Sequence, residues 1–250
     1  PFLDLGHKGA HTASLLRAPD AAAVARLIDA GRGSVRQVTL APELPGGIDA
    51  VRRFVTGGVA VAVGHTNATE DEASAAFDAG ATLLTHAFNA MPGIHHRAPG
   101  PILAAMRDDR VTLELIADGF HVHPDVIALA FAGAPGRIAL ITDAMAAAGA
   151  PDGDYELGGL AVRVIDGQAR LVENGAIDAL TVDVRAVEGT LIDELEEAAG
   201  PRDLGVPTGD GDVIEEDVSL GVTPHGGHIA VEEVARAGRR ARAHEQQGRS

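Results

Sequence analysis

The chain has 250 residues, a formal net charge of −16 and no cysteine. This length allows either one large core or two domains, and 46% hydrophobic residues with only 3% aromatics indicate a core of Ala, Val, Leu and Ile. The negative charge argues against nucleic acid and anionic membranes as partners, because both are bound through clustered Lys and Arg. The lack of cysteine excludes disulfides, thiolate metal sites and a cysteine nucleophile.

The chain opens at Pro1-Phe2-Leu3 without an initiator methionine, which is typical of a fragment whose N-terminus has been lost. Neither a basic leader with an apolar core nor a long apolar run is visible, so the sequence supports no signal peptide and no membrane span. We therefore expect a cytoplasmic protein.

From residue 34 to Asp143, short apolar runs alternate with helical stretches. Strands are predicted at residues 34–40, 59–63, 82–85, 111–117 and 138–142, and helices at 48–56, 68–79, 101–107 and 124–132. Successive strands are separated by roughly 20–30 residues, the length of a βα unit. This alternation predicts an α/β fold, namely an incomplete (β/α)8 TIM barrel of the metal-dependent hydrolase type.

The pattern changes after Asp143. Residues 155–172 alternate around an Asp-Gly turn signal at 166–167, which predicts a β-hairpin excursion. An acidic helix is predicted near residues 190–199, and the basic tail, residues 236–250, is expected to be partly disordered. We therefore divide the chain into a partial barrel domain, residues 1–176, and a divergent C-terminal segment, residues 177–250.

Two histidines, His65 and His86, each stand just past a predicted strand. In a parallel barrel, the first polar residues after the strands face the common mouth where chemistry takes place. Two imidazoles at neighbouring strand ends offer two nitrogen ligands to a cation such as Zn²⁺, although a third ligand is still needed. The alternative is that these side chains only hydrogen-bond to loop backbone.

Asp143 follows the predicted strand 138–142. A carboxylate at this position could take a proton from an attacking water and pass it to a leaving nitrogen, as amide hydrolysis requires. It could equally cap the Ala-rich turn that follows, and the two roles can coexist.

Further cationic or hydrogen-bonding groups stand beside the same mouth. Arg97 and His121 suit a phosphate or another anion. Paired histidines also allow a second metal. His95 and His96 are more typical of a solvated loop, since Gly and Pro surround them, and His123 precedes Pro124 at a predicted helix start.

A series of motifs resembles one known family. Over residues 1–176 the chain contains, in order, PFLDLGHKGAH, LAPE, GHTNAT, THAFNAMPGIHHRAPG, ELIADGFHVHP, ITDAMAAAGAPDGDYELGG and ARLVENGA. This series resembles N-acetylglucosamine-6-phosphate deacetylase of the amidohydrolase superfamily. The resemblance implies hydrolysis of the acetamide of N-acetyl-D-glucosamine 6-phosphate to D-glucosamine 6-phosphate and acetate, a step of amino sugar catabolism.

The resemblance also implies residue roles at the reacting centre. His65 and His86 match the metal-binding histidines, and the implied cofactor is one divalent metal ion, zinc in the first place, with iron, manganese or cobalt as alternatives. Asp143 matches the catalytic acid/base. His11 matches a histidine that contacts the amide carbonyl of the substrate and stabilises the developing oxyanion.

For the phosphosugar substrate, the resemblance implies a second group of residues. Asn89 and Ala90 match the turn that holds the sugar phosphate, together with His121. Arg97 matches an arginine that reaches the phosphate of the neighbouring subunit in family dimers, so a homodimer is implied.

Two departures from the family pattern leave other functions open. The family's third metal ligand, a glutamate, would lie two positions before Pro1, and residues 177–250 do not match the family's continuation. The alternatives are a different amidohydrolase acting on a cyclic amide, and an inactive fragment that binds a phosphosugar without hydrolysing it.

Overall fold

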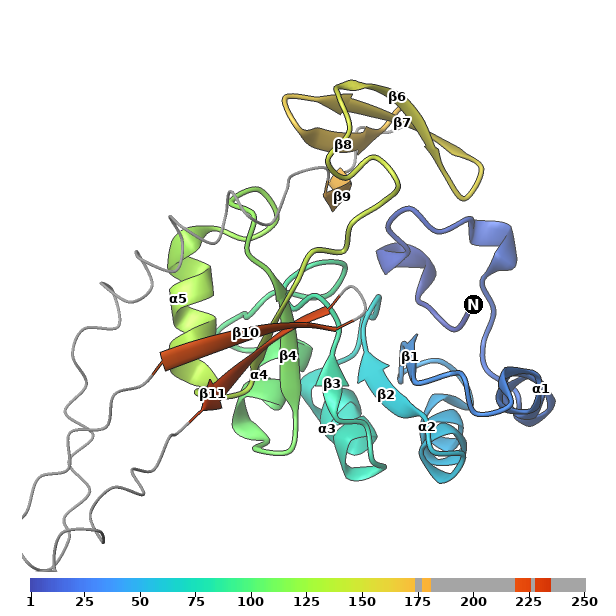
Figure 1. The fold of residues 1–250 in the computed structure, drawn as a ribbon. Coiled ribbons are helices and arrows are strands. Elements are labelled where there is room, and N and C mark those ends of the chain that lie inside the picture. The colour runs from blue at the N-terminus through green and yellow to red at the C-terminus, as the bar shows by residue number, and fades with distance from the viewer. Residues whose placement is uncertain (174–176, 181–218, 226–227, 235–250) are drawn as a thin grey trace, which may run out of the picture.

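The computed structural model describes residues 1–173, 177–180, 219–225 and 228–234. Within them, strands and helices alternate as predicted between residues 37 and 141 (Figure 1). The strands pair in parallel and in chain order, which confirms an α/β fold with a parallel sheet. They are β1 (Gln37–Leu40), β2 (Ala60–Val63), β3 (Leu83–Leu84), β4 (Thr112–Ile116) and β5 (Ile138–Ile141).

A helix connects each of these strands to the next. These helices are α2 (Gly47–Thr56), α3 (Glu70–Asp78), α4 (Gly100–Arg107) and α5 (Pro124–Gly133). Their ends follow local sequence signals: Thr69 and Glu72 form a capping box at the start of α3, and the side chain of His123 caps α5. All four helices were predicted, with bounds that differ by a few residues at most.

Helix α1 (Ala21–Gly31) was not predicted from the sequence. The carboxylate of Asp20 accepts a hydrogen bond from the backbone N–H of Ala23 at 2.8 Å, which caps the helix. Only Ala23 and Val24 of this helix are buried. Two short 3-10 turns, Leu5–His7 and Ala13–Leu15, precede it.

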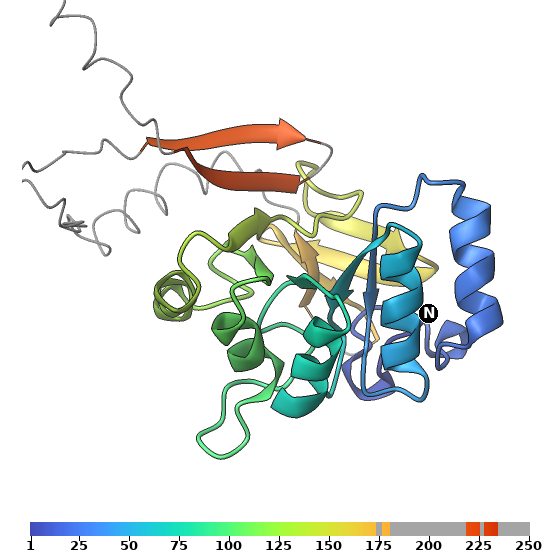
Figure 2. The ribbon, with the colours of Figure 1, turned by 90° about the horizontal axis from the view of Figure 1, so that it is seen from below.

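The sheet is strongly curved. Gln37 on β1 donates a hydrogen bond from Nε2 to Oε1 of Glu114 on β4, at 2.8 Å, although two strands separate β1 from β4 in the sheet. Figure 2 shows the helices following one another in chain order, from blue α1 to green α5, around the outside of the strands. The main core lies between these two layers and includes the fully buried rings of Phe2, Phe54 and Phe77.

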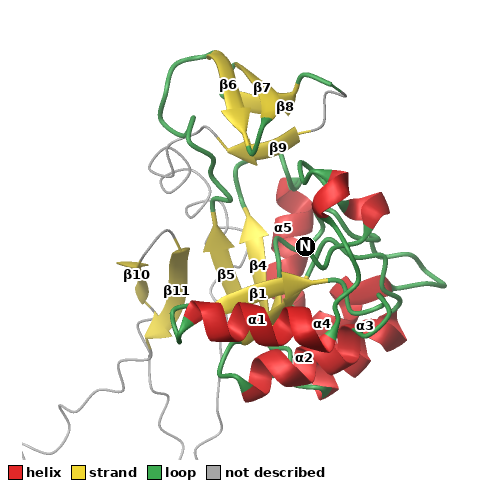
Figure 3. Cartoon of the chain, turned by 90° about the vertical axis from the view of Figure 1, so that its right-hand side faces the viewer, coloured by secondary structure: helices red, strands yellow, loops and turns green. Residues whose placement is uncertain are grey.

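A separate antiparallel sheet lies beyond the ends of β4 and β5 (Figure 3). Its strands β7 (Leu160–Ile165) and β8 (Gln168–Leu171) form the hairpin predicted around Asp166-Gly167. Strand β6 (Gly153–Leu157) pairs with β7, and β9 (Ile177–Leu180) pairs with β8. Its small core contains Val162, Val164 and Leu171 together with Met145 and Ala147 from the loop after Asp143, and Ala10 packs against it.

A second hairpin extends the large sheet. Strands β10 (Ser219–His225) and β11 (His228–Val234) pair antiparallel, and β11 pairs antiparallel with β5. The helix predicted at residues 190–199 and the tail at 236–250 lie outside the described residues. The division of the chain at residue 176 therefore remains a prediction. Among the described residues, no helix is long and apolar enough to cross a membrane.

Candidate active site

Three of the predicted site residues occupy equivalent positions in the sheet. His65, His86 and Asp143 each lie two residues beyond the end of a parallel strand, β2, β3 and β5 respectively. Parallel strands present their carboxyl ends at one edge of a sheet, so these residues share an edge. This shared edge is where the sequence pattern placed them.

His65 and His86 face one another directly. Their Nε2 atoms are 2.9 Å apart, and their rings are nearly perpendicular, at 80°. The ring of His11 also lies against that of His65, with ring centroids 4.8 Å apart. The structure thus brings together three histidines that are distant in the sequence.

The orientation of His65 is set by a backbone carbonyl. Its Nδ1 lies 2.8 Å from the carbonyl oxygen of His7. Because a carbonyl only accepts, Nδ1 carries the proton in the neutral ring, and the lone pair of Nε2 points toward His86. Burial and the neighbouring His86 lower the pKa of His65 from 6.5 to about 4. The ring is therefore neutral near pH 7, the form that binds a metal ion.

His86 is buried, and its Nδ1 has no hydrogen-bond partner among the described residues. The two facing Nε2 atoms nevertheless suit one cation: ligand nitrogens about 2.0–2.1 Å from zinc in tetrahedral geometry lie about 3.3 Å from each other. His65 and His86 therefore fit two positions of a metal site. Within the described part of the chain, no group of three or more His, Cys, Asp and Glu side chains is arranged around a common ion.

Backbone strain is concentrated at the same edge. His65, His86 and Asp143 have left-handed backbones with φ of 48°, 30° and 48°, as do Phe88 and Ala90 with φ of 78° and 49°. Non-glycine residues seldom adopt this region, and when they do they are enriched at functional sites. This strain supports the functional interpretation of the edge independently of the residue types.

Of the residues expected to bind the phosphosugar, only some lie beside the histidine pair. Asn89 hydrogen-bonds within the His86 turn, and the carbonyl of Ala90 accepts from the N–H of Thr66 at 3.2 Å, so both lie beside the histidine pair. Arg97 is exposed. In the described residues, no hydrogen bond or ion pair connects Arg97, His121 or Asp143 to the histidine pair.

Sequence reasoning missed several supporting residues. Asp118 accepts a hydrogen bond from Nδ1 of His121 at 2.7 Å, and its side chain is 2% exposed. Burial raises the pKa of Asp118, but hydrogen bonds from His121 and from the backbone N–H groups outweigh this and lower it overall. His7 and Glu43, which hold the His65 turn, were also missed. For Asp118 the spacing of three residues before His121 was an available signal.

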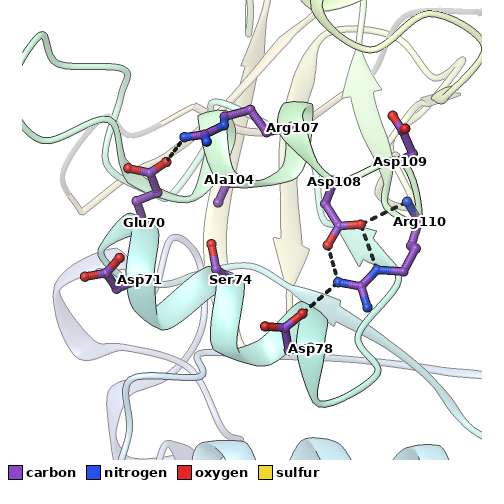
Figure 4. Close-up of a pocket in the computed structure, with 9 residues that line it drawn as sticks. All are labelled: Glu70, Asp71, Ser74, Asp78, Ala104, Arg107, Asp108, Asp109 and Arg110. Carbon is purple, nitrogen blue, oxygen red and sulfur yellow. Dashed lines mark hydrogen bonds and ion pairs between the residues drawn. The ribbon is translucent and has the colours of Figure 1, made fainter.

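A hollow of about 550 Å³ lies between α3 and α4, away from the histidines (Figure 4). Its two arginines are already paired: Arg107 with Glu70, and Arg110 with Asp78 and Asp108. Carboxylates outnumber arginines in its lining. The hollow therefore does not suit an anionic substrate, and the histidine edge remains the candidate active site.

No protein-family model matches the chain. Over 184 residues it is 45% identical to an N-acetylgalactosamine-6-phosphate deacetylase from Escherichia coli O157:H7, covering 73% of this chain and 49% of the relative. It is 36% identical over 188 residues to an N-acetylglucosamine-6-phosphate deacetylase from Vibrio furnissii, covering 75% and 47% of the two chains. The chain thus spans about half the length of these relatives.

A solved structure is similar as well. It is the N-acetyl-D-glucosamine-6-phosphate deacetylase D267A mutant from Mycobacterium smegmatis in complex with N-acetyl-D-glucosamine-6-phosphate. The identity is 43%, the TM-score is 0.74, and the match covers 80% of this chain and 54% of that one. Over the aligned part, the chain belongs to the N-acetylglucosamine-6-phosphate deacetylase family that its motifs resemble.

Proposed function

We propose that the protein hydrolyses the acetamide of N-acetyl-D-glucosamine 6-phosphate to D-glucosamine 6-phosphate and acetate. The observation that carries this proposal is the facing pair His65 and His86, with His11 beside it, at the carboxyl edge of a parallel sheet. Relatives of that name, at 36–43% identity, share the fold or the sequence around it.

In this proposal His65 and His86 would hold one divalent cation, zinc or alternatively iron, manganese or cobalt. When bound there, such a cation would lower the pKa of water and polarise the amide carbonyl. Nδ1 of His11 donates to the carbonyl of Lys8 at 2.8 Å, so His11 would act in its imidazolium form and donate from Nε2 to the substrate carbonyl oxygen, where it would stabilise developing negative charge. Asp143 takes a proton from the attacking water and later delivers it to the departing amine nitrogen.

The phosphate would be held at the opposite end of the substrate. Asn89 and Ala90 form the turn beside His86, and His121 is held in one orientation by Asp118. Arg97 is exposed, as expected for a side chain that reaches the phosphate bound by a neighbouring subunit. The proposal therefore includes a homodimer.

The same proposal includes a barrel fold and a cytoplasmic location. The curvature that brings Gln37 to Glu114 supports the inference that the sheet is part of a (β/α)8 barrel. Phosphorylated sugars are intracellular metabolites, so we propose a cytoplasmic protein.

The C4 epimer, N-acetyl-D-galactosamine 6-phosphate, is a second candidate substrate. It is favoured by the relative of that specificity in Escherichia coli O157:H7, which is 45% identical to this chain. Both epimers present the same acetamide and the same phosphate, so the proposed residue roles apply to either one. The comparisons do not favour a cyclic amide as substrate.

The test is acetate release by the purified chain loaded with Zn²⁺. The substrates are the two phosphosugar epimers, unphosphorylated N-acetylglucosamine and a cyclic amide. We expect turnover of at least one phosphosugar, and about tenfold to a hundredfold lower kcat/KM without the phosphate, since charge-assisted hydrogen bonds contribute about 1.5–3 kcal/mol. Binding of phosphosugar without acetate release would instead identify an inactive binding fragment.

A further inference from the structure

We propose that Glu43 is a positioning residue that holds the His65 turn in its ligand-binding conformation. This inference rests on the proposed function. Glu43 lies three residues beyond β1, and its two carboxylate oxygens accept hydrogen bonds from consecutive residues after His65. Oε2 accepts from the Oγ1 hydroxyl of Thr66 at 2.5 Å, and Oε1 accepts from the backbone N–H of Asn67 at 2.6 Å.

Thr66 transmits this contact to its surroundings. It is fully buried, and its Oγ1 also accepts from the N–H of Ala68 at 3.0 Å. Its own N–H donates to the carbonyl of Ala90, in the turn after His86. Without Glu43, the buried hydroxyl of Thr66 would lose the acceptor for its proton, which is costly in a protein interior. Through Thr66, Glu43 therefore connects the His65 turn to the His86 turn.

His65 needs such support because its conformation is strained. Its φ of 48° lies in the left-handed region, which L-residues other than glycine adopt only when their surroundings enforce it. The N-terminal segment holds His65 itself, through Asp4 N–H to the His65 carbonyl at 2.9 Å and through the His7 carbonyl to Nδ1. Glu43 secures the next two residues, so the turn is restrained on both sides.

Thr69 provides a matched control in the same loop. Its Oγ1 accepts from the N–H of Glu72 at the start of α3, and it makes no hydrogen bond to the His65 turn among the described residues. Thr69→Ala should lower Tm through loss of the helix cap while leaving the His65 turn unchanged. Glu43→Ala removes both acceptors, whereas Glu43→Gln retains one.

The experiment measures two properties of the full chain. One is the Zn²⁺ dissociation constant, determined by competition with a chromophoric chelator. The other is the ¹⁵N chemical shift of the His65 ring nitrogens in metal-free protein, which reports the tautomer. We expect Zn²⁺ binding about 10-fold to 100-fold weaker in Glu43→Ala, as for other residues that orient metal ligands. Glu43→Gln should be intermediate and Thr69→Ala unchanged.

The change in the His65 tautomer should rank the variants in the same order as the change in Zn²⁺ binding. The wild-type ring and that of Thr69→Ala should be protonated at Nδ1, and Glu43→Ala should show averaged shifts. Wild-type Zn²⁺ affinity and wild-type ring shifts in Glu43→Ala would overturn the proposal. If Glu43→Ala does not fold, Glu43→Gln decides it by the same two measurements. If the wild-type chain binds no Zn²⁺, the proposed function fails, and the ring shifts alone decide whether Glu43 positions His65.

Discussion

At the scale of single residues, neutrality and orientation distinguish the candidate ligand His65. Partial burial disfavours the charged ring, the His7 carbonyl selects the tautomer, and His86 lies opposite the free nitrogen of His65. The sequence predicted His65 and His86 as a pair because both follow apolar runs. It did not predict His7, because a backbone carbonyl carries no sequence signal and any residue could supply it.

The lowered pKa of His65 predicts a pH-dependent stability of the metal-free chain. The unfolded chain takes up a proton near pH 6.5, whereas the folded chain resists protonation until about pH 4. Below pH 6.5 the unfolded state therefore binds more protons, and the free energy of unfolding should fall by up to about 3 kcal/mol between pH 6.5 and 4. Urea unfolding at a series of pH values measures this change.

The matched control for that series is His65→Gln, which does not titrate. Its free energy of unfolding should lack the contribution of His65, so the difference between the two curves should change by up to about 3 kcal/mol as the pH falls to 4 and then stay constant. Identical slopes in both proteins would show that His65 is not protected from protonation.

Asp143 offers a second test at this scale. Its side chain is exposed and forms no hydrogen bond or ion pair within the described residues. Asp143→Asn should therefore change the free energy of unfolding by less than about 0.5 kcal/mol. It should nevertheless lower acetate release at least about 100-fold, the contribution typical of general acid/base catalysis. Retained turnover would refute the acid/base assignment.

At the scale of elements, four helices were predicted from their apolar faces and caps, whereas α1 was missed although Asp20 is a common N-cap residue. Helix α2 buries Ala50, Val51 and Phe54 on one face, and the capping box of α3 is visible as Thr69 followed three residues later by Glu72. Helix α1 packs mainly against α2 and buries little. The Asp20 cap is a local signal in the sequence, whereas the packing of α1 against α2 is decided by the tertiary structure.

Arg137 is a long-range stabiliser of α4. A helix leaves its last carbonyls without intrahelical donors, and the mostly buried guanidinium of Arg137 supplies donors there. Arg137→Met should therefore lower the free energy of unfolding by about 2–3 kcal/mol. The carbonyls that accept from it belong to Ala105, Met106, Asp108 and Val111, at 2.6–3.1 Å.

Arg53→Met is the control for Arg137→Met. Arg53 pairs with Asp49 at 2.7 Å on the exposed face of α2, where both side chains are about half exposed. Surface ion pairs contribute little to stability, so loss of this pair should lower the free energy of unfolding by less than about 0.5 kcal/mol. Equal losses in the two variants would contradict the capping role of Arg137. Chemical denaturation of both proteins makes the comparison.

At the scale of the whole molecule, the metal-binding proposal predicts that stability is linked to Zn²⁺. A ligand that binds only the folded state at 100 times its dissociation constant adds about 2.7 kcal/mol to the free energy of unfolding. Zn²⁺ should therefore raise Tm, a chelator should reverse the increase, and His86→Ala should abolish it. A Tm that does not respond to Zn²⁺ in the wild-type chain would contradict a site formed by the histidine pair.

The sequence by itself determined the βα alternation, the hairpin at Asp166-Gly167 and the polar residues at the strand ends. These features are local: hydrophobic periodicity, turn residues and caps act over a few neighbouring positions. Its motif series also identified the family, which the comparisons confirm. The bounds of strands and helices were accordingly close to those observed.

Only the tertiary structure decided how distant residues meet. The contacts of Gln37 with Glu114, of His65 with His7 and of Glu43 with Thr66 join residues 77, 58 and 23 positions apart. Such contacts depend on sheet curvature and on how loops close over the strand ends, which the pattern along the chain does not encode. That geometry places the two Nε2 atoms face to face and holds His65 in a strained turn, because packing around the sheet edge outweighs local backbone preference.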